Sequence, residues 1–150
     1  MDMRTRWILL SSVLALVAGP LSAQVTTGAA RLHQIDQSRI GADVTFVDTG
    51  DTLIVQGSAA GLDPTKAYIS LLYDRGSKPS GPEPCEPTDD SLSGPQMFVW
   101  AWTVEADGTG TIMAVKTGDG YAPLAAVGTM SIRVGPAFGV QACGRVHEDD

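Results

Sequence analysis

The sequence predicts an all-β fold, an antiparallel Greek-key sandwich or flattened barrel of seven or eight strands. After residue 37, helical periodicity is almost absent and short runs of alternating apolar and polar residues replace it. Turn signals rich in Gly, Pro and Asp separate these runs at intervals of about 8–15 residues. Short strands at this spacing are typical of antiparallel sandwiches and barrels.

Residues 1–23 have the features of a secretory signal peptide. Arg4 and Arg6 precede an apolar run, residues 8–18, whose length of about eleven falls within the range of a signal core. A membrane span needs about 18–20 residues, so an uncleaved anchor is the less favoured alternative. We expect cleavage before Gln24, a secreted or periplasmic location and no membrane span afterwards.

The remaining chain has the size of one domain. We expect a flexible arm at residues 24–38, a β-sandwich over 39–147 and an acidic tail at 148–150. Without the charges of the first segment, eight basic and sixteen acidic residues remain, a net charge of −8. Nucleic-acid binding needs clustered Lys and Arg, so the composition argues against a nucleic-acid partner.

The first three expected strands are joined by short turns. Residues 43–48 alternate apolar and polar side chains, and residues 52–59 place apolar or small residues at every second position from Leu53. Residues 68–73 are almost uniformly apolar, which predicts a central strand buried on both faces.

A loop of about 22 residues, 74–95, follows, and a structureless loop of this length is normally functional or tied down. It holds Cys85, and the only other cysteine is Cys143 in the last expected strand. Two cysteines in an exported chain most simply form one disulfide. A redox pair is the alternative, but it usually has a Cys-x-x-Cys spacing.

The later strands complete the pattern. They are expected at 97–104, 111–115, 128–134 and 138–146, and a hairpin turn at 106–110 joins the first two of these.

Trp100 and Trp102 are two residues apart, which predicts that both lie on one face of their strand. If that face is inner, both rings fill the core, which is the interpretation we favour. If it is outer, Trp100, Trp102 and Tyr121 make a candidate interaction surface for a sugar, a peptide or a partner sheet.

Several short segments also carry a resemblance to a known family. They are residues 51–57, Gly61-Leu62, residues 104–108, Gly128-Thr129-Met130 and Ala142-Cys143-Gly144. In this order and spacing, the chain resembles the copper–zinc superoxide dismutases over residues 41–146. The resemblance implies their sandwich, which shares the immunoglobulin-like architecture, and it implies pairing of Cys85 with Cys143.

The metal site of that family has no counterpart in this sequence. Its ligands are histidines, and the positions that match four of them hold Ile69, Leu71, Met97 and Arg133. The position that matches the family's functional arginine holds Val140. The 74–95 loop holds no histidine, and His33 and His147 lie outside the matched segment. The resemblance therefore implies a dismutase-like scaffold without the active site.

We therefore expect a secreted, non-catalytic binding or structural domain with no catalytic residue, metal ligand or cofactor. Its partner, an unidentified protein or small molecule, would contact the 74–95 loop or an exposed sheet face. One alternative is a divergent copper–zinc superoxide dismutase with an unrecognised site. Another is copper capture by Met97, Met130 and the two histidines, because thioethers and imidazoles are copper ligands.

Overall fold

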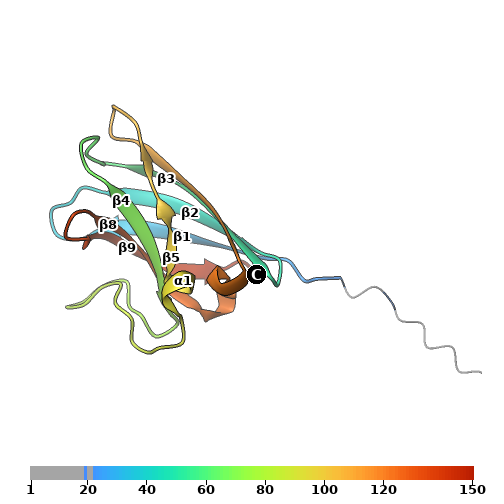
Figure 1. Ribbon diagram of the computed structural model, residues 1–150. Coiled ribbons are helices and arrows are strands. Elements are labelled where there is room, and N and C mark those ends of the chain that lie inside the picture. The colour runs from blue at the N-terminus through green and yellow to red at the C-terminus, as the bar shows by residue number, and fades with distance from the viewer. Residues whose placement is uncertain (1–18, 20–21) are drawn as a thin grey trace, which may run out of the picture.

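The computed structural model describes residue 19 and residues 22–150, so the expected signal peptide lies almost entirely outside the described residues. In the described part of the chain, nine strands form one antiparallel sheet in the order β5-β4-β8-β9-β1-β2-β3-β7-β6. The sheet curls into a nearly closed barrel (Figure 1). The all-β prediction is confirmed, with more strands than expected. The strands are β1 (Thr26–Gln34), β2 (Gly41–Asp48), β3 (Thr52–Ala60), β4 (Tyr68–Asp74), β5 (Phe98–Ala101), β6 (Thr103–Val104), β7 (Gly110–Thr117), β8 (Val127–Val134) and β9 (Gly139–Glu148). Short helical turns are α1 (Gly94–Met97), η1 (Gly118–Gly120) and η2 (Leu124–Ala126).

The expected flexible arm at residues 24–38 is wrong. Most of it is β1, which pairs with β2 on one side and β9 on the other. Its inward positions include Gly28 and Ala30, which bury little apolar area, so the apolar alternation that marks other strands is weak here. Gly28 is required by close packing, because a Cβ there would lie 2.5 Å from the carbonyl oxygen of His147.

The core lies inside the barrel and draws on nearly every strand. Its largest fully buried apolar side chains are Leu32, Val44, Phe46, Leu53, Val55, Leu72, Leu124, Val127, Met130 and Ile132. Alternation predicted the inner faces of β2 and β3 correctly. The prediction that residues 68–73 are buried on both faces also holds for most of β4, because a long loop covers its outer side.

The barrel is closed by one segment that changes partner in its middle. β5 pairs with β4, and β6 pairs with β7, with Trp102 between the two strands. The backbone N–H of Trp102 donates to the Tyr68 carbonyl at 2.9 Å, and its indole N–H donates to Ser70 Oγ at 2.8 Å. The two ends of the sheet therefore meet along this segment, which we call the seam.

The seam breaks the expected alternation of residues 97–104. Trp102 is buried, with 6% of its surface exposed, whereas Trp100 is 58% exposed. The core prediction is therefore right for Trp102 and wrong for Trp100. The cause is a register shift of β5 against β4, followed at once by the change of partner. Val99 and Trp102, three residues apart, are both buried, which a regular strand does not allow.

Residues 75–93 form the long loop, which is fixed at several points. The expected disulfide between Cys85 and Cys143 is confirmed and ties the loop to β9 across a separation of 58 residues. At the start of the loop, Asp74 accepts hydrogen bonds from the backbone N–H groups of Gly76 and Thr88, at 3.0 and 2.7 Å, and from the Thr88 hydroxyl. Burial alone would raise the pKa of the Asp74 carboxyl, but these donors outweigh it and lower the pKa.

Within the described residues, no helix has both the length and the hydrophobicity that crossing a bilayer requires.

Removal of the disulfide should lower stability substantially. A cross-link over this separation restricts the unfolded chain by about 4 kcal/mol in the chain-entropy model. We expect reduction, or the double substitution Cys85→Ala with Cys143→Ala, to lower the free energy of unfolding by a large part of that amount in urea titrations. An unchanged unfolding midpoint would show that the cross-link contributes nothing.

Candidate functional site

An apolar groove runs along the seam on the outside of the barrel. Phe98 and Trp100 of β5 line one side, and Met113 and Val115 of β7 line the other. Their exposed fractions are 40%, 58%, 56% and 60%. The space between them is about 410 Å³. We call this feature the seam groove.

The groove exists because the seam is only partly paired. β6 pairs with the first two residues of β7, and the remainder of β7 pairs with β3 alone. β5 pairs only with β4, so β5 and β7 lie beside each other without a ladder between them. Four of the six exposed large apolar residues in the described part of the chain gather here. Clustered apolar exposure of this kind typically marks a binding surface, whereas scattered apolar residues do not.

The two aromatic rings of the groove contact each other. The centroids of Phe98 and Trp100 are 6.1 Å apart, with the ring planes inclined by 55°. This tilted arrangement is one that aromatic pairs favour. It leaves both rings available to a ligand while each restricts the other.

Lys116 bridges the inner end of the groove. Its side chain is buried, and Nζ donates to the carbonyl oxygens of Pro95, at 3.1 Å, and Phe98. These bonds connect β7 to α1 and β5 where the strands do not pair. Burial lowers the pKa of the Lys116 ammonium.

Tyr121 lies beside this region but supports the fold. It is half-buried against the core, and its hydroxyl donates to Asp48 Oδ1 at 2.8 Å. Burial, together with the bond to the Asp48 carboxylate, raises the pKa of Tyr121 to about 12. Of the three predicted surface residues, only Trp100 lines the groove, while Trp102 and Tyr121 pack inward. Met113, Val115 and Lys116 were not singled out from the sequence.

The other region of interest surrounds the disulfide, between the long loop and the outer face of β4, β8 and β9. Leu71, Met97 and Val140 pack with Tyr73 and the two cysteines into a small second apolar cluster. Three of the positions that the sequence resemblance aligned with functional residues of the dismutases therefore hold packed apolar side chains.

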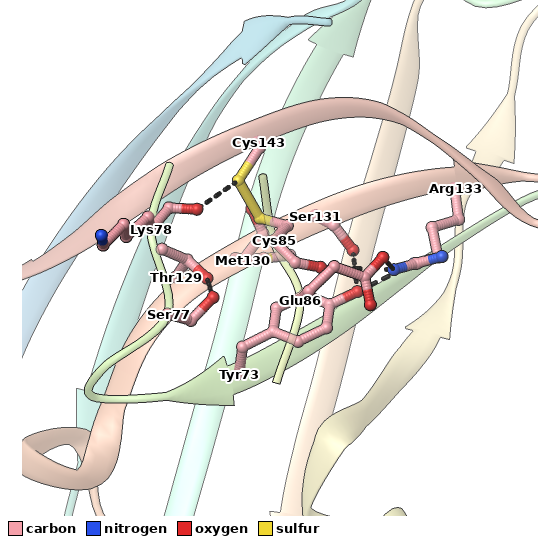
Figure 2. Close-up of a disulfide and its surroundings, with 10 residues drawn as sticks. All are labelled: Tyr73, Ser77, Lys78, Cys85, Glu86, Thr129, Met130, Ser131, Arg133 and Cys143. Carbon is pink, nitrogen blue, oxygen red and sulfur yellow. Dashed lines mark hydrogen bonds and ion pairs between the residues drawn. A yellow bond between two sulfur atoms is a disulfide. The ribbon is translucent and has the colours of Figure 1, made fainter. Parts of the chain in front are cut away.

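Arg133, which the sequence resemblance aligned with a fourth such residue, makes four hydrogen bonds, and Figure 2 shows those to Tyr73 and Glu86. Its guanidinium donates to the Tyr73 hydroxyl at 2.8 Å, to the Phe138 carbonyl at 2.9 Å and to Glu86 Oε1 at 3.0 Å. The Tyr73 hydroxyl also shares a hydrogen bond of 2.9 Å with Ser131. Burial raises the pKa of Tyr73, so the phenol stays protonated at neutral pH. These groups hold the long loop in place.

Among residues 22–150, no three His, Cys, Asp or Glu side chains come together as a metal site would require. Met130 lies wholly in the core, while His33 and His147 lie on the outer surface of β1 and β9. Comparison with protein-family models and with curated proteins found no match to this chain.

The two tryptophans should respond differently to substitution. Trp102→Ala removes a fully packed ring and leaves Ser70 unpaired, so we expect a loss of about 3–5 kcal/mol in the free energy of unfolding. Trp100→Ala changes an exposed side chain and should alter stability by about 0.5 kcal/mol or less. Urea titrations followed by circular dichroism measure both. Equal losses would contradict the assignment of Trp100 to the surface.

Lys116 should make the free energy of unfolding depend on pH in the alkaline range. The pKa of its ammonium is lowered by folding from 10.5, so the unfolded chain binds more protons between the folded-state pKa and 10.5. The free energy of unfolding of the native chain, relative to Lys116→Met, should therefore rise as pH increases from 7 toward 10.5. Lys66→Met, at an exposed lysine, is the matched control. A pH-independent difference for Lys116→Met would refute this expectation.

Proposed function

We propose that the protein is a secreted or periplasmic, non-catalytic domain that binds a protein partner through the seam groove. The observation that carries the proposal is the gathering of Phe98, Trp100, Met113 and Val115 along one exposed groove. The disulfide fits an oxidising compartment outside the cytoplasm, as the predicted signal peptide does. The scaffold is proposed to be the Greek-key sandwich of the copper–zinc superoxide dismutases, put to a different use.

The groove favours an apolar segment of a protein as the ligand. Aromatic side chains and Met are enriched at the centres of protein interfaces, where they bury large areas. The only charged group that lines the groove is Lys116, and its ammonium is already bonded to two carbonyl oxygens. A sugar would need several free polar groups for orientation, and the groove wall is mostly apolar.

The dismutase alternative is less well supported by the same residues. A copper site needs several imidazoles in one fixed geometry. Leu71, Met97 and Val140 fill the corresponding region with apolar contacts, and Arg133 is committed to the loop.

Photo-crosslinking in the producing cell tests the proposal. A benzoylphenylalanine side chain placed at Trp100 should yield a discrete adduct, identified by mass spectrometry. The same group at Val25, which is equally exposed but outside the groove, is the matched control and should not yield that adduct. In a second arm, the variant that carries the crosslinker at position 100 also receives Met113→Ser. This substitution should lower the yield of the adduct while leaving the fold intact.

Two outcomes would overturn the proposal. Identical adducts from both positions, or none from Trp100, would show that the groove has no dedicated partner. Stoichiometric copper in the purified protein, together with superoxide removal, would establish the dismutase alternative instead.

A further inference from the structure

A second crevice lies on the outer face of β1 and β9, beneath the start of the long loop. Its volume is about 420 Å³, which is within the range of small-molecule sites. Cys143 and Gly144 form part of its floor, and Pro79 and Ser80 of the long loop form a wall. The disulfide fixes that wall over the strands, since it joins Cys143 to the same loop.

Two arginines and two histidines gather at this crevice in an acidic protein, and because of the arginines we call it the cationic crevice. Arg31 and His33 of β1 and Arg145 and His147 of β9 all line it, including both histidines of the chain. The pairing of Ala30 with Val146 and of His33 with Cys143 places Arg31 directly opposite Arg145. Side chains directly opposite in an antiparallel pair have Cβ atoms about 5 Å apart, and like charges there are destabilising. The full chain nevertheless has a net charge of −7.

Only one of these two arginines is neutralised. Arg31 Nε donates to Asp43 Oδ1 at 2.9 Å, and both side chains are largely exposed. Arg145 is half-buried and takes part in none of the three ion pairs among the described residues. A half-buried arginine that lies opposite another arginine in the strand pair, and that forms no ion pair with a carboxylate, is a site where an anion would be stabilising.

The remaining lining restricts the kind of anion. Ile35 and Pro79 give the crevice an apolar side next to the charged one. A bare inorganic ion would leave that apolar side in contact with water, whereas a ligand with a short hydrocarbon part would cover it.

We propose that this crevice binds a small organic anion, a carboxylate or a phosphate ester. The anionic group lies between Arg145, Arg31 and His33, and the hydrocarbon part packs on Ile35 and Pro79. The site is distinct from the seam groove and does not depend on the function proposed for it.

Titration of the purified protein followed by nuclear magnetic resonance tests this proposal. The probes are hexanoate and hexyl phosphate, which separate the two anionic groups, with hexanol as the neutral control at matched ionic strength. We expect saturable shifts at the amides of Ser80 and Arg145 and at the His33 ring, from one or both anions and not from hexanol. Acetate should bind more weakly than hexanoate, because it lacks the apolar part.

Substitutions decide whether the crevice is responsible. Arg145→Gln should weaken binding about tenfold or more, in line with the loss of a charged hydrogen bond. Lys66→Gln removes one positive charge elsewhere and should leave binding unchanged. If Arg145→Gln does not fold, Arg31→Gln provides the same test. Non-saturable shifts, equal shifts with hexanol, or equal weakening by Lys66→Gln would overturn the proposal.

Discussion

A single short segment closes the barrel, and this closure determines where the core is sealed and where the apolar groove lies. An antiparallel sheet that stays open exposes two unpaired edges, which invite association with other chains. Here β5 pairs with the edge of β4, and β6 pairs with the edge of β7. Trp102, between β5 and β6, holds the segment in place through its hydrogen bonds to Tyr68 and Ser70. Because β6 is only two residues long, most of the edge of β7 stays uncovered. The seam groove is thus a direct consequence of how the fold closes.

The long loop is held by a different set of interactions, and it covers the outer side of β4, β8 and β9. The disulfide and the Arg133 guanidinium fix it at Cys85 and Glu86 (Figure 2). The Asp74 carboxylate fixes it at Gly76 and Thr88. As a result, the outer faces of β4, β8 and part of β9 are sheltered, whereas the outer faces of β1, β2, β3 and β7 are largely exposed. The Cys85–Cys143 bond therefore contributes twice, since it stabilises the domain and also builds a wall of the cationic crevice.

Much of the fold was predictable from the sequence, and the exceptions have physical causes. β2 and β3 alternate clearly, and the pairing of the only two cysteines had one simple solution. β1 was missed because Gly28 gives no apolar signal. The exposure of Trp100 was missed because a bulge and a change of partner are tertiary features. Met113 and Val115 were missed because β7 is apolar on both faces. The exposed Met113 and Val115 alternate with the buried Ile112 and Ala114, so the residue types do not reveal which face is the outer one.

The two proposed binding surfaces are separated by the topology itself. In the strand order, β9 and β1 stand near the middle, whereas the groove is formed where the two ends of the order meet. In a sheet that closes on itself, the middle and the meeting ends lie on opposite sides of the barrel. A protein in the seam groove therefore leaves the cationic crevice accessible, and any coupling between them has to pass through the packed core. Loss of binding at one surface after a substitution at the other would thus indicate damage to the fold rather than a shared site.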